Sequence, residues 1–387
     1  MTSKLRICIV GAGLAGLALA ATITGDDVDA TIFERRDAVE ALGGGIILQP
    51  NAARALQEVG CFDEVCRAGT ELTHLVQHRD GERVEISQHE VWPRLRLPTV
   101  AVHRHILHAI LLDRAKAQAA VELSRQVVDL AEGHDRAVAV RTDDGSAPEF
   151  DLVVGADGVQ SVIRAHAAPR SEIRELGLWW ARWIVDAGSD LPREWYTERL
   201  RRVGLGAFPL GQDEVQVFAT IPQEDMTDGR QERTLEAITR SAVVLRHATR
   251  HGCRLVHVGA AREVHPHVWG AHRVALAGDA AHAMSPTLSA GGGLAIEDGV
   301  LLGRLLNGAQ PVDSIVSRYA ELRRPRLAWM AKVGRMQIRL SQGTPPDAGR
   351  TELASHLRRM YAPLDEPDYF PLALSGAEPG QAKTTRR

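Results

Sequence analysis

The sequence is poor in lysine and carries almost no net charge. Its only lysines are Lys4, Lys116, Lys332 and Lys383, and 46 basic against 49 acidic residues leave a formal net charge of −3. Proteins that bind nucleic acid through a basic surface carry a clear excess of positive charge. The near-neutral balance therefore argues against nucleic acid as a partner.

Cysteines and long apolar runs are also scarce. The four cysteines form no CxxC pair, which favours a reducing compartment. No apolar run reaches the roughly 18 residues that a membrane span needs. The chain passes directly from MTSKLR into an apolar strand pattern, which leaves no room for a signal peptide. We therefore expect a cytoplasmic protein without a membrane span.

Metal-binding and hydrolytic patterns are missing as well. His265, His267, His272 and His282 lie close together in the sequence, but they straddle strand and turn segments and do not share one helix face. No metal site is therefore predicted. The sequence also shows no Ser-His-Asp arrangement. With 387 residues, 44% of them hydrophobic and 25% charged, the chain is long enough for two compact domains or one large interleaved one.

A strand, a glycine turn and a helix open the chain. The apolar run Leu5–Val10 precedes Gly11-Ala-Gly13-Leu-Ala-Gly16, and Glu34 ends the next predicted strand, 18 positions beyond Gly16. In such a βαβ unit the glycines permit a tight turn and close approach to a pyrophosphate, and the acid accepts hydrogen bonds from a ribose. The segment predicts a dinucleotide site. An acid at this position disfavours NADP, and both FAD and NAD remain open.

Two further segments place an acid after an apolar strand. "DLVVGADGVQSVIR" carries Asp157-Gly158, and "RVALAGDAAHAMSPTLSAGGGLAIEDG" carries Asp279, Pro286 and the run Gly291–Gly293. Alone, the Asp157 turn is better explained by a strand-to-helix turn in which Asp157 caps the helix. If its strand lies beside the first in one parallel sheet, all three turns meet at the carboxyl edge, where ligands bind. Asp279 is suited to sugar or ribityl hydroxyls, and the glycine run is expected to lead into a helix at about Leu294.

Together the three segments resemble the class A flavoprotein aromatic hydroxylases, of the p-hydroxybenzoate and salicylate hydroxylase type. The resemblance covers most of the chain and includes "VHRHILHAIL" and "YAELRRPR". It implies an FAD site, with Asp279 on the ribityl chain and Pro286 beside the flavin ring. The cofactor-binding residues that it implies are Gly11, Gly13, Leu14, Ala15, Gly16, Glu34, Arg35, Gly45, Arg104, Val127, Asp157, Gly158, Asp279, Pro286, Gly291, Gly292 and Gly293.

One loop departs from the family pattern. Where relatives typically have Gly-Gln-Gly-x-Asn, this chain has Ser289-Ala290-Gly291-Gly292-Gly293. Two side chains that often contact the flavin or shape its pocket are therefore missing. This departure bears on how the ring is positioned and how efficiently it is reduced, and less on FAD binding itself.

The resemblance also implies an architecture. The expected fold is α/β, with a Rossmann-like FAD-binding domain interleaved with a smaller mixed-sheet substrate domain and followed by a C-terminal helix. We expect the FAD-binding domain over residues 1–72, 100–172 and 265–345, the substrate domain over 73–99 and 173–264, and a C-terminal extension over 346–387. The long helix that begins near residue 313 is expected to be interrupted near Pro325.

The middle segment is expected to form the substrate wall. Alternation places Trp180, Arg182 and Ile184 on one face of a strand and Trp179, Ala181 and Trp183 on the other, without deciding which face meets the flavin. The substrate candidates are Arg182, Phe208, Gln216 and Phe218, with Arg182 as a possible anchor for a carboxylate. A role in the core of the domain, or on its surface for Arg182, stays open.

By resemblance, NADH or NADPH reduces the FAD, O₂ adds at flavin C4a, and the hydroperoxide hydroxylates a small aromatic or heteroaromatic substrate. No side chain is singled out as catalytic, because the flavin carries this chemistry. Alternatives are an FAD oxidase, reductase or halogenase on the same scaffold, or a non-catalytic flavin-binding protein. A halogenase is expected to have WxWxIP and a catalytic lysine, and "WWARW" does not match. The chain is expected to act as a monomer or homodimer.

Overall fold

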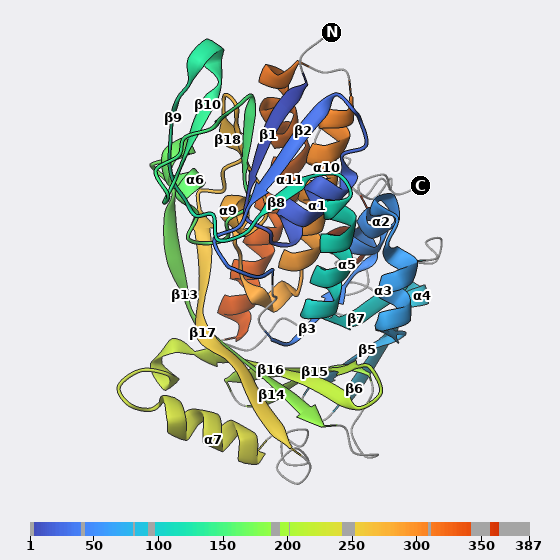
Figure 1. The fold of residues 1–387 in the computed structure, drawn as a ribbon. Helices are drawn as coiled ribbons and strands as arrows, with labels where there is room; N and C mark the ends of the chain where they lie inside the picture. Colours follow the sequence, from blue (N-terminus) through green and yellow to red (C-terminus); the bar gives the residue numbers. More distant parts are fainter. Residues whose placement is uncertain are drawn as a thin grey trace, which may run out of the picture.

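The computed structural model describes residues 4–39, 43–79, 82–91, 97–186, 194–200, 202–241, 252–308, 311–341 and 357–363. Two large sheets dominate the fold, one at each end of the molecule in the view of Figure 1. The two long strands β13 (Glu172–Asp186) and β17 (Cys253–His265) run side by side between these ends. None of the helices in these ranges has both the length and the apolar character needed to cross a bilayer.

A six-stranded sheet contains the three predicted motif strands. In spatial order its strands are β18 (Gly270–Ala271), β19 (Val274–Leu276), β12 (Leu152–Gly155), β1 (Leu5–Val10), β2 (Val28–Phe33) and β8 (Ala120–Glu122). All of its pairings are parallel except that of β18 with β19. The prediction that the Asp157 strand lies beside the first strand is therefore confirmed.

Both faces of this sheet are covered, as its unbroken apolar strands require. Ile7 and Ile9 of β1 belong to the large core formed with the helices, whereas Cys8 and Val10 point into a second core. That second core lies against a small sheet of β9 (Val127–Glu132), β10 (Val138–Thr142) and β11 (Glu149–Phe150). The alternation along β1 thus separates two layers of packing.

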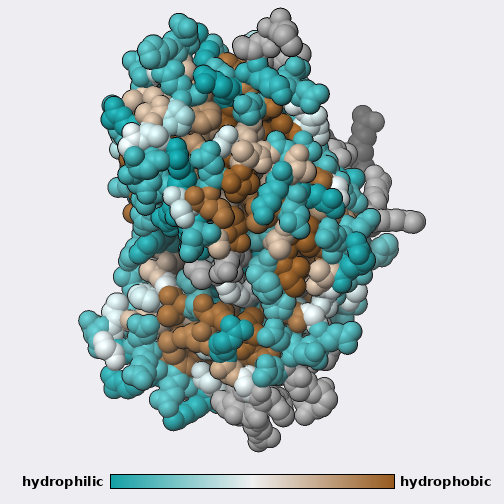
Figure 2. All heavy atoms as spheres, in the orientation of Figure 1, coloured by the Kyte–Doolittle hydropathy of each residue, from teal (hydrophilic) through white to brown (hydrophobic). Residues whose placement is uncertain are grey.

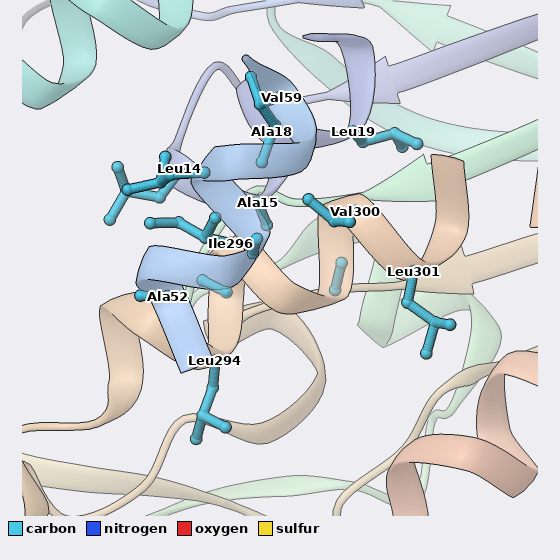
Figure 3. Packing of buried hydrophobic residues seen from close by; sticks show 14 of the residues in the cluster. Leu14, Ala15, Ala18, Leu19, Ala52, Val59, Leu294, Ile296, Val300 and Leu301 are labelled. Atoms are coloured by element: carbon cyan, nitrogen blue, oxygen red, sulfur yellow. The ribbon is translucent and has the colours of Figure 1, made fainter. Parts of the chain in front are cut away.

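Helices of distant sequence form the layer on the other face. They are α1 (Leu14–Thr22), α2 (Pro50–Val59), α3 (Phe62–Ala68), α5 (Arg104–Lys116), α10 (Gly291–Asn307) and α11 (Val312–Ser341). Figure 3 shows side chains of α1, α2 and α10 gathered in one cluster. The helices α1 and α10 approach closely at Gly299, because a Cβ there would lie 2.4 Å from the Ala15 carbonyl oxygen.

The seven-stranded sheet forms the other end of the molecule. Its spatial order is β17, β13, β16 (Glu214–Pro222), β15 (Val203–Leu210), β14 (Trp195–Leu200), β5 (His74–Arg79) and β6 (Glu82–Ser87). Helix α7 (Gln231–Ser241) covers one face with Ile238 and Leu235 against Ala181, Trp183 and Val217. The opposite face of the seven-stranded sheet faces the helices that cover the six-stranded sheet. Figure 2 shows hydrophobic residues gathered on the surface of this lower region, beneath a more hydrophilic upper part.

Shorter elements complete the structure. A three-stranded sheet consists of β3 (Gly45–Leu48), β7 (Thr99–His103) and β4 (Thr70–Leu72). Its strand β7 packs against β15 of the seven-stranded sheet, in a hydrophobic core that includes Leu75 and Phe208. The remaining helices are α4 (Gln88–Val91), α6 (Val162–Ala167) and α9 (Asp279–His282), with 3₁₀ turns η1 (His134–Arg136), η2 (Gln223–Asp225) and η3 (Pro286–Leu288).

Two expectations about helices are wrong. Helix α11 is not interrupted at Pro325 but continues through it. Arg323 and Arg326, on either side of the proline, are fully buried in ion pairs with Glu297 of α10, and these contacts hold both halves in one helix. Helix α10 begins at Gly291 rather than near Leu294, so the glycine run forms its first turn. Most of the segment 346–387 lies outside the described residues.

Candidate active site

Four parallel strands bring the predicted motifs to one edge. Strand β1 ends at Val10 before Gly11, β2 ends at Phe33 before Glu34, and β12 ends at Gly155 before Asp157. Strand β19 ends at Leu276, three residues before Asp279. Segments that lie far apart in the sequence thus meet at the carboxyl edge of the sheet, where open α/β proteins bind their ligands.

The first turn requires glycine on steric grounds. Gly11 has φ of +103°, and a Cβ on it would lie 2.6 Å from the Ala156 carbonyl oxygen. A Cβ on Gly16 would lie 2.1 Å from the Gly11 carbonyl oxygen. Glu34 fixes the same turn, since its Oε2 accepts a hydrogen bond of 2.9 Å from the Ala12 amide. The helix N-terminus at Gly13 has no side-chain cap, so its amides are available to an anion.

The second turn is held from within. Ser161 caps α6, and Asp157 Oδ2 accepts a 2.8 Å hydrogen bond from the Val162 amide, while Asp157 Oδ1 is buried and has no partner within the described part of the chain. Burial raises the pKa of the Asp157 carboxyl. Arg164 is buried and donates to the carbonyl oxygens of Val159 (2.6 Å) and Ala280 (2.9 Å). The arginine therefore joins the second motif to the third instead of facing the cavities.

The third turn rests on a buried ionic network. Asp298 accepts hydrogen bonds from the Gly278 amide (2.8 Å), His282 Nε2 (2.5 Å) and Arg323 Nε (2.6 Å). Despite complete burial, the charge of Arg323 and then of His282 hold the pKa of Asp298 at about 2. The network fixes the backbone directly before Asp279. Burial lowers the pKa of the half-buried Arg104, and the exposed Asp279 carboxylate partly opposes that shift.

Two adjoining cavities lie along this edge. A cavity of about 250 Å³ is lined by the first and second turns, and a cavity of about 410 Å³ lies between the third turn and the seven-stranded sheet. Both are bordered by Gly13, His108, Ala156 and Gly158, so together they form one elongated space. An elongated space with a helix N-terminus near its middle matches the shape of a dinucleotide.

The predicted cofactor residues divide between these cavities. Gly11, Gly13, Glu34, Arg35, Val127, Asp157 and Gly158 line the smaller one. Gly13, Leu14, Ala15, Gly45, Arg104, Gly158, Asp279, Pro286, Gly291 and Gly292 line the larger one. Gly16 and Gly293 line neither, because Gly16 packs on the Gly11 carbonyl and Gly293 packs on Asn51 and Ala52.

These residues fit FAD. Next to the smaller cavity the turn at Gly11 excludes any side chain, and Asp157 Oδ1 and His108 Nδ1 are buried polar atoms without a partner in the described structure. The larger cavity offers Asp279 together with the glycine-rich start of α10. The smaller cavity would hold the adenosine end of the cofactor, and the larger one its ring together with a substrate. A bound flavin supplies redox and oxygen chemistry that side chains lack.

One face of the seven-stranded sheet closes the larger cavity. Trp180, Arg182, Phe208, Gln216 and Phe218 all line it. Strand pairing places Arg182 opposite Phe218, and the rings of Trp180 and Phe218 stack 5.0 Å apart with an angle of 16° between their planes. The structure thus decides the point that alternation leaves open: the Trp180–Arg182 face meets the cavity, and the Trp179–Trp183 face packs under α7.

The four substrate candidates differ in whether their side chains already have partners within the protein. The side-chain oxygen of Gln216 accepts a hydrogen bond from the Gly45 amide, so this residue ties the sheet to β3. The ring centroids of Phe208 and Phe218 lie 6.2 Å apart, with the two rings tilted toward each other. No carboxylate acts on the charge of Arg182 among the described residues, and its Nε is buried without a partner. Burial, and then the charge of Arg104, lower the pKa of Arg182 to about 10.

Sequence reasoning did not select several residues at the site. Trp180 shares a strand face with Arg182 but is not among the substrate candidates, although its stacking on Phe218 makes it part of the wall. His108 of α5 is buried and borders both cavities. The helix pattern of α5 identifies its buried face, but it does not show that this face meets a ligand space.

Comparison with known proteins agrees with this geometry. Residues 4–332 match the FAD binding domain family. The chain belongs to that family. The match takes in all three motif segments and the whole of the seven-stranded sheet.

Curated relatives of the chain include monooxygenases of aromatic compounds. The chain is 29% identical to 2-heptyl-3-hydroxy-4(1H)-quinolone synthase of Pseudomonas aeruginosa, with 88% of this chain and 91% of the relative covered. It is 31% identical to 3-amino-4-hydroxybenzoate 2-monooxygenase of Streptomyces cremeus, with 84% of each chain covered. The assignment to the FAD-dependent aromatic hydroxylases is thereby confirmed, and with it FAD as the cofactor.

Solved structures share the fold. Klebsiella pneumoniae HpxO, in complex with FAD and uric acid, superposes with a TM-score of 0.77 at 22% identity, covering 92% of both chains. A tetrameric form of 2-methyl-3-hydroxypyridine-5-carboxylic acid oxygenase gives a TM-score of 0.74 at 22% identity, covering 92% of this chain and 96% of the other. The expected α/β architecture is confirmed.

Proposed function

We propose that this FAD-dependent monooxygenase hydroxylates a small, electron-rich aromatic or heteroaromatic compound that carries an anionic group. NADH or NADPH is the proposed electron donor, docking transiently, and O₂ is the second substrate. A monomer or homodimer in the cytoplasm is part of the same proposal. So is the division into an FAD-binding and a substrate domain at the boundaries expected from the sequence.

The observation that carries the anionic group is Arg182. Its guanidinium borders the larger cavity, is largely desolvated, and has no carboxylate partner among the described residues. A buried charge without a counter-ion is costly. A carboxylate or phenolate on the substrate would remove that cost and form charge-assisted hydrogen bonds. The names of two relatives, a hydroxybenzoate and a hydroxynicotinate monooxygenase, agree with an acidic aromatic substrate.

The aromatic wall supports the ring of such a substrate. Trp180 and Phe218 present a stacked pair to the cavity, and Phe208 packs against Phe218. With Arg182 on the neighbouring position of the same strand face as Trp180, a substrate would be held at its anionic group and along its ring at once. Two-point holding orients one ring carbon toward the flavin and excludes water from the reacting side.

The cavity argues against the halogenase alternative. A halogenase was expected to carry a catalytic lysine, and none of the side chains lining either cavity in the described structure is a lysine. Only Arg104, His108, Arg182 and Asp279 are titratable among the residues that line the larger cavity. The chemistry offered by this chain's own residues is therefore binding and orientation, with oxygen activation left to the flavin.

A paired panel of compounds tests the proposal. FAD-loaded protein is mixed with NADH or NADPH and with hydroxybenzoates, hydroxypyridine carboxylates and hydroxyquinolones, each acid being paired with its methyl ester or amide. We expect acids to accelerate cofactor oxidation and to gain one oxygen atom by mass, while their neutral partners do so weakly. Equal turnover of esters and acids would remove the role of Arg182, and no oxygenated product from any compound would remove the proposed reaction.

A further inference from the structure

The segment that leads from α9 into the first turn of α10 borders the larger cavity, and it is held from within by hydrogen bonds of Ser285 with Thr287 and of the Ser289 amide with the Pro286 carbonyl oxygen. Residues 285–293, here called the cavity loop, line the cavity with Ser285, Pro286 and the positions from Ser289 to Gly292. The loop includes three glycines in succession and lacks the two side chains that the family pattern places there. The glycines form the first turn of α10 and bring no side chain that could fix the residues before them.

The cavity loop also contains a strained residue. Ser289 has φ of +50° and ψ of +27°, in the left-handed region that a residue with a Cβ rarely adopts. In the family pattern this position is glycine, for which the same conformation is free of strain. The Ser289 amide donates a 3.0 Å hydrogen bond to the Pro286 carbonyl oxygen, and contacts from outside the loop add to this hold.

The C-terminal part of the described chain provides such a contact. The hydroxyl of Tyr361, which is buried, donates a hydrogen bond to the carbonyl oxygen of Leu288, the residue directly before Ser289. The Leu288 side chain is buried as well, and its Cδ1 would lie 3.5 Å from a Cβ on Gly334 of α11. The rear of the loop thus rests on α11 and on Tyr361, while its front lines the cavity.

Tyr361 is itself firmly held. Arg326 donates to the carbonyl oxygens of Met360 (2.5 Å) and Ala362 (2.8 Å), the residues on either side of Tyr361. Glu297 of α10 pairs with the same arginine at 3.3 Å, and both charged side chains are almost completely buried. A closed chain of contacts therefore runs from α10 through α11 and residues 360–362 back to the loop that precedes α10.

We propose that residues 357–363 tether the cavity loop, with Tyr361 as the positioning residue that holds Leu288 and Ser289 in place for the flavin end of the cofactor. The segment acts on the loop from behind and does not touch the cavity. The proposal goes beyond the proposed reaction, and its first test needs neither cofactor nor substrate.

The first test is hydrogen exchange in the ligand-free protein. Tyr361→Phe removes the hydroxyl and keeps the ring. Losing one buried hydrogen bond of about 1 kcal/mol raises the open population of the loop roughly fivefold. We expect about fivefold faster exchange in a peptide spanning residues 284–296, where the Ser289 amide bonds to Pro286 and the Leu294 amide to Ala290. The peptide of β1 is expected to be unchanged.

Two further variants separate a tether from general stabilisation. Tyr196→Phe is the matched control, because it removes another tyrosine hydroxyl bond, to Glu198 in the seven-stranded sheet, far from the loop in the sequence. It should leave exchange of the loop peptide unchanged. Adding Ser289→Gly to Tyr361→Phe relieves the left-handed strain and should return the loop peptide toward the wild-type rate.

The second test compares FAD with ADP. ADP would use only the turn at Gly11–Gly16, whereas FAD also reaches the cavity loop. We expect Tyr361→Phe to raise the dissociation constant of FAD about fivefold, the same equilibrium loss as in the loop, and to leave that of ADP unchanged. Unchanged loop exchange overturns the proposal, and so does an equal effect on FAD and ADP. A failure of the monooxygenase assignment would leave the exchange result intact, so the two can be told apart.

Discussion

Replacing Arg182 by methionine should make the protein more stable and a poorer binder of its substrate. Methionine keeps an unbranched side chain of similar length and removes the charge. Arg182 is largely desolvated and lies near the charge of Arg104, and both effects lower its pKa to about 10. The charge of Arg182 is therefore unfavourable for folding. Its position at a cavity wall indicates that the charge serves ligand binding instead.

The magnitude follows from the pKa. At pH 7 the guanidinium is charged in the folded and the unfolded chain, so the full cost of its burial opposes folding. That cost declines only as the pH rises through the folded pKa. The drop from 12.5 to about 10 corresponds to about 3 kcal/mol. Removing the charge should therefore raise the melting temperature by up to roughly 4 °C in a chain of this length that unfolds in one transition.

Binding should change in the opposite direction. A charge-assisted hydrogen bond to an anionic substrate contributes about 1.5–3 kcal/mol, so its loss raises the dissociation constant roughly 10- to 150-fold. Neutral ester analogues should bind the variant and the wild type equally. FAD binding should be unaffected, because Arg182 lies on the sheet wall and not on the dinucleotide turns.

Thermal melts with and without ligand measure both effects. The wild type should gain stability from an acid that is a substrate, and Arg182→Met should start from a higher melting temperature and gain less. Arg170→Met serves as a control, since Arg170 is exposed and lines neither cavity. A lower melting temperature of Arg182→Met, or undiminished binding of the acid, would contradict the reasoning.

Three further variants test other parts of the site. Asp279→Ala should raise the dissociation constant of FAD roughly 10- to 100-fold through loss of charged hydrogen bonds, as measured by flavin fluorescence; full retention of FAD would contradict the assignment of the third motif. Gly206→Ala should raise KM for substrate at unchanged FAD affinity, because its Cβ would lie 2.0 Å from the Phe218 ring and displace it from Trp180; an unchanged KM would show that the wall does not contact substrate. Burial, and then the charge of Arg104, lower the pKa of His108 to about 4. The free energy of unfolding should therefore fall by up to about 3 kcal/mol as the pH drops from 6.5 to about 4. Denaturant titrations of His108→Gln should show a weaker dependence of that free energy on pH over this range.

The local parts of the site could be predicted from the sequence. Gly11, Asp157 and Asp279 each follow a short apolar strand, and parallel pairing alone brings the ends of such strands together. Their types are also dictated locally, as the positive φ of Gly11 illustrates. These features depend on the nearest neighbours in the chain, which sequence patterns report well.

The parts that depend on distant contacts could not be predicted. Pro325 stays inside α11 because Arg323 and Arg326 are anchored to α10, and a proline rule has no access to that contact. The inward face of β13 is decided by α7, which covers the other face, and alternation treats the two faces as equal. Tyr361 touches Leu288 across 73 positions of sequence, and nothing in either local pattern announces the contact.

The packing of α1 against α10 has a consequence for the order of events on the ribosome. Residues 14–22 are made early, yet their buried face meets residues 291–307, which emerge near the end of synthesis. Until then the nascent chain carries an uncovered apolar helix and an incomplete carboxyl edge, a state that invites capture by chaperones. If FAD occupies the two cavities as proposed, it can be fully bound only once translation has passed α10, because the turns after β1, β12 and β19 border those cavities together.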